Sequence, residues 1–229
     1  MRSGAKVVAV AGAVLLCGGS GLLGREAYLE AKGMLAERLI VHALERHLED
    51  GEAHRPWSWA DFHPIAWLEV PHLRVRRHVL SGASGTSLAF GPGHVDGTAP
   101  PNGPGTCVLA GHRDTWLRFA RDLRPGDEVT LRTTEGSRRY VARSGRVVPE
   151  DDLSVLELAS PGSPRRLVLV TCWPFEGLLR SPWRYVVECE EQETALFQTG
   201  TLDRPDAVHT RRSHHGTLLR RRSAGQAFF

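Results

Sequence analysis

The stretch Leu167-Val-Leu-Val-Thr-Cys172 has four consecutive apolar residues and then ends on a polar threonine and a cysteine. A short apolar run that contains β-branched residues is typical of a strand that is covered on both faces. A residue at the end of such a strand is held rigidly and still reaches the rim of the sheet. The stretch therefore predicts a mainly β domain that presents Cys172 at the edge of its core.

Further short apolar runs, separated by glycine, proline and aspartate, surround this one between residues 65 and 190. The predicted strands are 66–70, 76–80, 107–110, 128–132, 139–144, 167–171 and 185–189. Turn signals lie at 125–127, 133–136 and 160–164, and short helical stretches fit at 116–122 and 151–158. Strands at this spacing predict a closed or nearly closed β-barrel.

The N-terminus indicates export. Arg2 and Lys6 precede an uncharged run over residues 7–24, which as a helix rises about 27 Å, just short of the ~30 Å hydrocarbon core. The positive flank predicts a cytoplasmic N-terminus with the rest of the chain outside. A cleaved signal peptide and a lipoprotein cysteine at Cys17 are the alternatives, although Leu16 does not suit lipoprotein processing.

The segments outside the barrel complete a four-part organisation. It consists of an anchor at 1–24, a helical stalk and linker at 25–64, the barrel at 65–190 and a basic, disordered tail at 191–229. Leucines about one turn apart predict the stalk as an amphipathic helix that Gly51 ends. A partner-binding helix is the alternative for the stalk, and contact with anionic lipid headgroups is the alternative for the tail.

Composition excludes several classes of protein. With 41% hydrophobic and 24% charged residues, the chain is neither collagen-like, wholly disordered nor multi-spanning. A net charge of +3, with the surplus in the tail, does not indicate nucleic acid. The histidines show no metal-ligand spacing, no Cys-x-x-Cys occurs, and no glycine pattern joins a strand to a helix. We therefore expect no metal and no cofactor.

Three residues fit acyl-transfer chemistry. His112 follows the apolar strand that ends in the Val108-Leu-Ala-Gly stretch, Cys172 ends its own strand, and Arg184 opens the last strand. If the last two strands are neighbours, Arg184 lies beside Cys172. A thiolate can act as the nucleophile, an imidazole can protonate a leaving amine, and a guanidinium can stabilise an oxyanion. The alternative is that all three residues are structural.

Motifs around these residues resemble the sortases, in particular the exported sortases of Gram-negative bacteria. The matching segments are Ala89-Phe-Gly-Pro-Gly-His94, Gly97-Thr-Ala99, Ala110-Gly-His-Arg-Asp-Thr115, residues 121–129, Leu169-Val-Thr-Cys-Trp-Pro-Phe175 and Arg184-Tyr-Val-Val187. The resemblance covers about residues 67–190. The chain departs from the family pattern at Val168, where threonine is common, and at Cys107, where asparagine or another small polar residue is usual.

The resemblance implies an eight-stranded barrel and a membrane-anchored cysteine transpeptidase. It makes His112 the general acid/base, Cys172 the nucleophile and Arg184 the oxyanion stabiliser, with Arg180 as a rival for the last role. The implied partners are a protein with a C-terminal LPXTG-like sorting signal, cleaved at Thr-Gly, and an amine acceptor. The implied location is the inner membrane, with a single span and a periplasmic catalytic domain. The alternatives are a plain cysteine endopeptidase and an exported, barrel-shaped binding module.

Four further residues are candidates for substrate contact. His94 stands near the barrel mouth, and Asp114 would share a face with His112 if the strand continued. Trp173 and Phe175 follow the nucleophile and could form a wall of the peptide groove. The alternatives are turn capping for the first two and packing for the aromatic pair. A disulfide between Cys107 and Cys189 also stays open.

Overall fold

The structure is a computed structural model that describes residues 2–152, 154, 164–177, 179 and 181–192. Of residues 2–18 and 21 it describes the backbone alone. The predicted tail from 193 onward and most of the predicted helix at 151–158 lie outside the described residues.

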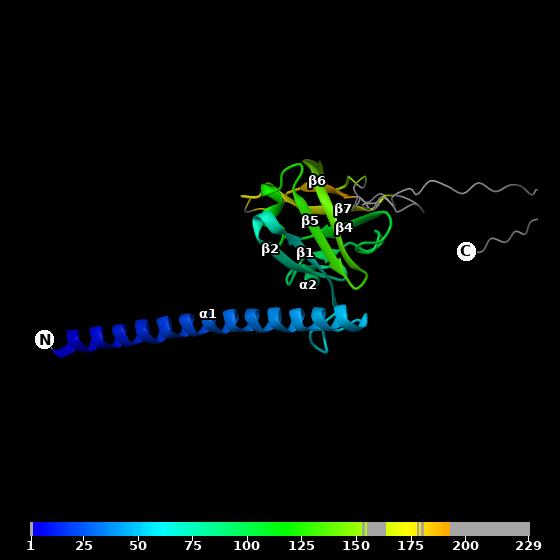
Figure 1. The fold of residues 1–229 in the computed structure, drawn as a ribbon. Coiled ribbons are helices and arrows are strands. Elements are labelled where there is room, and N and C mark those ends of the chain that lie inside the picture. Colours follow the sequence, from blue (N-terminus) through cyan, green and yellow to red (C-terminus); the bar gives the residue numbers. More distant parts are fainter. Residues whose placement is uncertain (1, 153, 155–163, 178, 180, 193–229) are drawn as a thin grey trace, which may run out of the picture. The chain divides into compact units, whose positions relative to one another are not determined.

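Eight strands in the described residues close into a barrel (Figure 1). They are β1 (Pro64–Val70), β2 (Val75–Leu80), β3 (Gly93–His94), β4 (Thr106–Ala110), β5 (Glu128–Thr133), β6 (Gly136–Pro149), β7 (Arg166–Trp173) and β8 (Trp183–Glu191). Their order around the barrel is β1-β2-β3-β4-β7-β8-β6-β5. The prediction of a mainly β, closed eight-stranded barrel is confirmed. Strands β4 and β7 run parallel, and β8 is antiparallel to both β7 and β6.

Strands β3 and β6 differ most from the prediction, and the other strands differ from their predicted ranges by at most two residues at either end. Strand β3 has only two residues, too few to leave a pattern, and it was not predicted. Strand β6 extends on both sides of the predicted segment 139–144, because its ends pair with β5 and β8 although most of its side chains face solvent. The short helices are η1 (Pro71–Leu73), α2 (Gly85–Leu88) and η2 (Arg118–Asp122), of which η2 lies within the predicted stretch 116–122.

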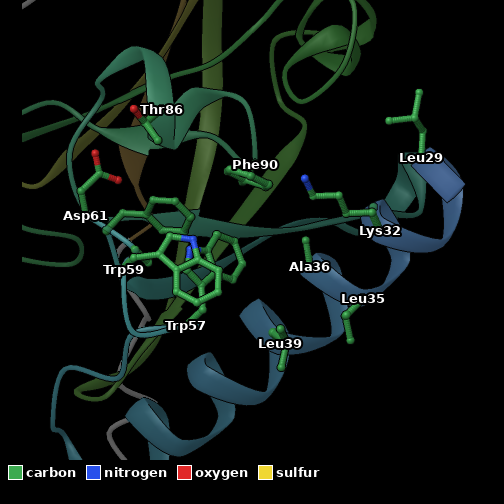
Figure 2. A pocket seen from close by; sticks show the side chains of 13 residues that line it. Leu29, Lys32, Leu35, Ala36, Leu39, Trp57, Trp59, Asp61, Thr86 and Phe90 are labelled. Atoms are coloured by element: carbon green, nitrogen blue, oxygen red, sulfur yellow. The ribbon is translucent and has the colours of Figure 1, made fainter.

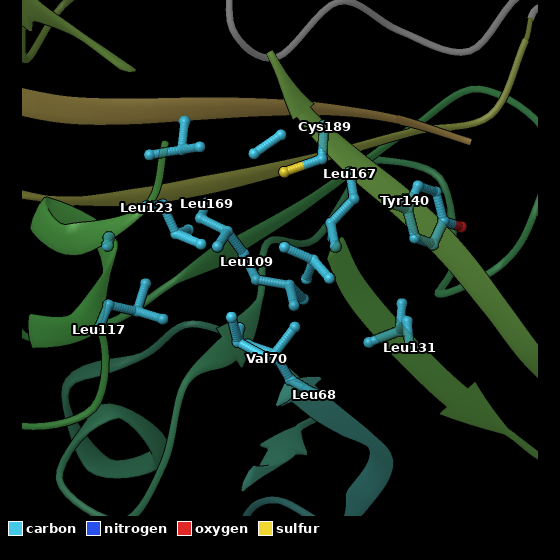
Figure 3. Close-up of a cluster of buried hydrophobic side chains, with 14 of the residues drawn as sticks. Leu68, Val70, Leu109, Leu117, Leu123, Leu131, Tyr140, Leu167, Leu169 and Cys189 are labelled. Carbon is cyan, nitrogen blue, oxygen red and sulfur yellow. The ribbon is translucent and has the colours of Figure 1, made fainter. Parts of the chain in front are cut away.

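The apolar run of β7 is buried on both faces, as predicted. Leu167 and Leu169 point into the barrel interior, where Figure 3 shows them beside Leu109 of β4. Val168 packs on the outer face in a second buried cluster with valines of the neighbouring strands, Val108, Val148 and Val186. Successive side chains of a strand alternate between faces, so both faces need apolar residues here. Cys172 falls on the outer, valine-covered face.

A buried asparagine fastens the long loop between β3 and β4. Asn102 is 1% exposed and has a left-handed φ of 63°. Its Nδ2 donates to the carbonyl oxygens of Leu131 at 3.0 Å and Gly136 at 3.2 Å, and the Tyr140 hydroxyl donates to its Oδ1 at 3.1 Å. The loop is therefore tied to the β5–β6 hairpin by one side chain.

Replacing Asn102 with alanine should lower the free energy of unfolding by about 2–4 kcal/mol. The variant loses these bonds together and leaves the hydroxyl of buried Tyr140 without its partner. Urea denaturation measures the loss, and Tyr140→Phe, which removes a single bond, should cost about 1 kcal/mol. A loss below that of Tyr140→Phe would contradict this role for Asn102.

The long helix α1 (Arg2–Asp50) contacts the barrel near its C-terminal end. Ile40 is buried in an apolar cluster with Phe62 and Leu80. Glu37 lies 3.3 Å from the ring of buried His78 on β2, which holds the pKa of the Glu37 carboxyl below its usual value. Gly51 ends the helix as predicted, with a positive φ of 79° that suits glycine.

Among the described residues, no helix is both long enough and apolar enough to cross a membrane. The predicted anchor at 7–24 falls mostly on positions whose side chains lie outside the description. It stays a prediction.

Candidate active site

Strand pairing places Cys172 and Arg184 directly opposite each other. Cys172 is the second-last residue of β7, and its register partner on antiparallel β8 is Arg184. Opposed residues of an antiparallel pair have Cβ atoms about 5 Å apart. Both side chains are partly exposed. The expectation that the last two strands are neighbours is thus correct, and it brings the thiol and the guanidinium to one face.

His112 reaches the same end of the barrel from β4. Because β4 and β7 are parallel, their carboxyl ends meet at one edge, where Ala110 pairs with Val170. Two bonds extend this pairing: the Gly111 N–H donates to the Val170 carbonyl at 3.1 Å, and the Thr171 hydroxyl donates to the Gly111 carbonyl at 2.7 Å. His112 follows immediately and is exposed.

Gly111 is required for this turn. A Cβ at this position would lie 2.7 Å from the side chain of buried Leu117, closer than carbon atoms can approach. The Leu117 N–H in turn donates to the His112 carbonyl at 3.0 Å. Gly111 and Leu117 therefore fix the backbone position of His112.

Arg184 is held by three hydrogen bonds. Its Nη1 donates to the carbonyl oxygens of Ser181 at 2.9 Å and Trp183 at 3.0 Å, and its Nη2 donates to Glu150 Oε2 at 2.6 Å. The rival Arg180 lies outside the described residues. No sequence pattern indicates Glu150, because 34 residues separate it from Arg184 along the chain.

Arg113 is a second residue that sequence reasoning did not single out. Its Nη2 donates to the carbonyl oxygens of Gly177 and Leu179, in the segment that follows β7. Arg113 thus joins the turn that carries His112 to the segment beyond Cys172. Its position next to His112 was the only signal in the sequence.

The predicted substrate residues lie in two different surroundings. His94 Nε2 lies 2.8 Å from the Ala99 carbonyl oxygen and 3.1 Å from Thr98 Oγ1, which fits the turn-capping alternative. Asp114 is exposed in the turn after β4. The premise that it continues the strand and shares a face with His112 is wrong, because β4 ends at Ala110.

Trp173 and Phe175 pack with Tyr185 at the end of the barrel interior. The ring centroids of Trp173 and Tyr185 lie 5.8 Å apart, and Phe175 meets Tyr185 at 5.3 Å. Phe175 is buried in the core cluster, so it has the packing role that was the alternative to substrate contact. Trp173 is partly buried against the same cluster, on the face of β7 opposite to Cys172.

A groove of about 120 Å³ lies on the outer face, the face of β7 to which Cys172 also belongs, although Cys172 does not line it. Valines of four strands line it, with Arg184 and Glu150 also on its wall. A larger cavity of about 530 Å³ lies between α1 and the segment that follows it. Figure 2 shows leucines of α1, such as Leu35 and Leu39, facing Trp57 and Phe90 across it. That cavity is apolar and brings none of the three candidate residues together.

The other described cysteines differ from Cys172 in burial. Burial raises the pKa of the Cys107 thiol to about 12 and that of the Cys189 thiol to about 12. Both are free. Cys107 on β4 and Cys189 on β8 are both register partners of Leu167 on β7, which lies between them. Their Cα atoms are therefore two strand spacings apart, about 9.5 Å, which is too far for a disulfide. The open possibility of a Cys107–Cys189 bond is therefore excluded in this structure.

A family model described as the sortase domain matches residues 68–192. The chain belongs to the sortase family. Sortases are cysteine transpeptidases, and the resemblance to this family is confirmed at the level of the family. This sortase is 32% identical over 120 residues to Sortase D of Bacillus subtilis (strain 168). The match covers 52% of this chain, and the chain spans 60% of the length of that relative.

Solved structures share the fold of this sortase. A Clostridium perfringens Sortase D5 transpeptidase matches with a TM-score of 0.56 at 20% identity, over 69% of this chain and 99% of that one. Sortase A from Corynebacterium diphtheriae matches with a TM-score of 0.52 at 21% identity, over 59% of this chain and 63% of that one. At these identities the likeness shows the barrel alone.

Proposed function

We propose that this sortase cleaves an LPXTG-like sorting signal at its Thr-Gly bond and transfers the acyl group to an amine. The observation that carries the proposal is the meeting of three groups at one end of the barrel. Cys172 and Arg184 are register partners, and His112 follows the strand that lies parallel to β7. A thiol, an imidazole and a fixed guanidinium are the groups that acyl transfer through a thioester needs.

In the first half-reaction, the Cys172 thiolate attacks the threonine carbonyl carbon and a C–S bond forms. The negative charge that develops on the carbonyl oxygen accepts hydrogen bonds from Arg184, which stays charged at any pH of interest. The C–N bond then breaks. His112 in its protonated form gives a proton to the leaving glycine amine, and the threonine acyl group stays on Cys172 as a thioester.

In the second half-reaction, an amine attacks the thioester carbonyl. Neutral His112 accepts the proton that the amine loses, an amide bond forms, and Cys172 leaves as a thiolate. Water in place of the amine gives a carboxylic acid, which is the endopeptidase alternative. The two outcomes share the first half-reaction, so the nucleophile that resolves the thioester decides between them.

The valine-lined groove supports an apolar peptide beside Cys172. Val108, Val170 and Val186 line it together with Arg184, the register partner of Cys172. The Leu-Pro part of an LPXTG-like signal is apolar and has few hydrogen-bond donors. Such a segment suits a floor of β-branched side chains better than a charged peptide would.

A labelled LPXTG peptide with an added glycine-based amine tests this function. We expect a thioacyl adduct on Cys172 by mass spectrometry and a transpeptidation product whose yield rises with the amine concentration. A thiol alkylator adds a second test, because an accessible Cys172 reacts while buried Cys107 and Cys189 do not. A Cys172 as unreactive as these two would favour the binding-module alternative.

We also propose that residues 7–24 anchor the enzyme in the cell membrane, with the barrel on the extracytoplasmic, periplasmic side. The uncharged run and its positive flank support this topology. Fractionation should recover the full-length chain with the inner membrane. A shortened, freely soluble periplasmic form would instead support the cleaved signal peptide.

A further inference from the structure

The hydrogen bonds of Arg184 leave a defined part of its guanidinium free. A guanidinium has five N–H groups, two on each Nη and one on Nε. The bonds to Ser181 and Trp183 take both N–H groups of Nη1, and the bond to Glu150 takes one of Nη2. Among the described residues, one N–H on Nη2 and the Nε–H therefore have no acceptor and remain for a substrate oxygen. Nε and Nη2 form one edge of the planar guanidinium, and an oxyanion can bind along this edge.

The backbone of Glu150 is bonded to the residue that precedes the strand of Arg184. Glu150 directly follows β6, whose Val148 is the register partner of Arg184. The Glu150 N–H donates to the Pro182 carbonyl at 2.7 Å, next to the Ser181 carbonyl that Arg184 binds. The end of β6 and the start of β8 thus hold the backbones of Glu150 and Arg184 next to each other.

The 2.6 Å bond between Arg184 Nη2 and Glu150 Oε2 is charge-assisted, the strongest class of hydrogen bond in proteins. The other two bonds of Arg184 are to backbone carbonyls within three residues of it, both at Nη1. Both hold the Nη1 end of the guanidinium and neither contacts Nη2. Only the bond to Glu150 fixes the second nitrogen, and with it the direction of the two remaining N–H groups.

We propose that Glu150 is a positioning residue, which orients the Arg184 guanidinium so that its free N–H groups face the oxyanion at Cys172. This inference rests on the proposed function, because it assigns Glu150 a task in the same reaction. Glu150 acts through Arg184 and does not touch the reacting atoms. An arginine side chain has four rotatable bonds. If its conformation is already fixed before the reaction, no side-chain entropy is lost when it binds the transition state.

Kinetics with the peptide substrate test the proposal first. Glu150→Ala should lower kcat about 10- to 100-fold and leave KM nearly unchanged, because the donor is misdirected and not removed. Glu150→Gln keeps an acceptor oxygen at the same reach and should recover part of the loss. Glu188→Ala is the matched control: Glu188 binds Arg146 at 3.0 Å at similar exposure, and its removal should leave kcat unchanged.

A double-mutant cycle shows whether Glu150 acts through Arg184. In an Arg184→Ala background, Glu150→Ala should have no further effect on kcat, since there is no guanidinium left to orient. If the two losses multiply, Glu150 acts independently and the proposal is overturned. A Glu150→Ala variant that is faster than wild type overturns it as well, because the ion pair would then restrain Arg184 away from the substrate.

Side-chain NMR separates this inference from the proposed function. The Arg184 Nε and Nη signals, assigned by their loss in Arg184→Lys, should be those of a restrained guanidinium in the full chain. They should average in Glu150→Ala and persist in Glu188→Ala. Unchanged signals in Glu150→Ala overturn the positioning role whatever the kinetics show. An inactive wild type overturns the proposed function, and these signals then still decide whether Glu150 fixes Arg184.

Discussion

Replacing Cys172 with alanine is expected to abolish thioacyl formation and to lower turnover of a sorting-signal peptide by at least about 10⁴-fold. No other described cysteine can take over, because Cys107 and Cys189 are buried and their thiols have raised pKa values. The change removes one sulfur atom from a partly exposed position at the end of β7. We therefore expect the barrel to keep its circular dichroism spectrum and its unfolding midpoint to within experimental error.

Cys189→Ala is the control for this variant. Its sulfur lies in the barrel core, so its removal should destabilise the fold by about 1 kcal/mol and leave the acyl-enzyme intact. The two variants thus separate a loss of the nucleophile from a loss of core packing. Detection of a peptide adduct on the Cys172→Ala enzyme would show that another residue is the nucleophile.

Arg184→Lys is expected to cost about 10²-fold or more in kcat, the scale of losing one oxyanion donor. A lysine ammonium is a point charge that cannot span the carbonyls of Ser181 and Trp183, the Glu150 carboxylate and an oxyanion at once. Single-turnover acylation of Cys172 measures the effect on the first half-reaction directly. KM should change little, because the interaction forms mainly in the transition state.

The rival arginine supplies the comparison. Arg180→Lys, assayed beside Arg184→Lys on the same peptide, should lose far less activity. If Arg180→Lys loses more activity than Arg184→Lys, the oxyanion donor is Arg180. If neither variant is impaired, backbone N–H groups hold the oxyanion without an arginine.

The barrel could be predicted from the sequence where burial dictates residue type. The strand that carries Cys172 is buried on both faces, so its apolar run was visible, and its predicted end at Thr171 lies two residues before the observed end at Trp173. Strand β6 was underestimated because most of its side chains face solvent and its length is set by pairing with β5 and β8. Pairing partners far apart in the chain leave no local pattern.

In the candidate site, too, residues at the ends of apolar strands could be predicted, and residues whose partners are distant in the sequence could not. His112, Cys172 and Arg184 were candidates because each lies at the end of an apolar strand. Glu150 and Arg113 were not, since their partners lie 34 and 64 or more residues away and neither has an unusual sequence context. The disulfide stayed open for the same reason. Only the order of the strands shows that β7 separates the two buried cysteines.

The three proposed catalytic groups stand on parts of the molecule that differ in how readily they open. Cys172 and Arg184 belong to strands of a closed barrel and pair with each other, so we expect their backbone amides to open together with the β7–β8 ladder. His112 stands in a turn that two backbone bonds, the Thr171 hydroxyl and the side chain of Arg113 fasten. Such a turn opens at a lower free energy than the strands beside it.

Rising temperature or denaturant therefore separates the imidazole from the thiol while the barrel is still folded. Amide hydrogen exchange would register this as a small, early opening confined to the residues after Gly111, well before the global transition. We therefore expect the local stability of this short turn, and not the stability of the barrel, to limit the temperature range in which the proposed catalytic groups stay together.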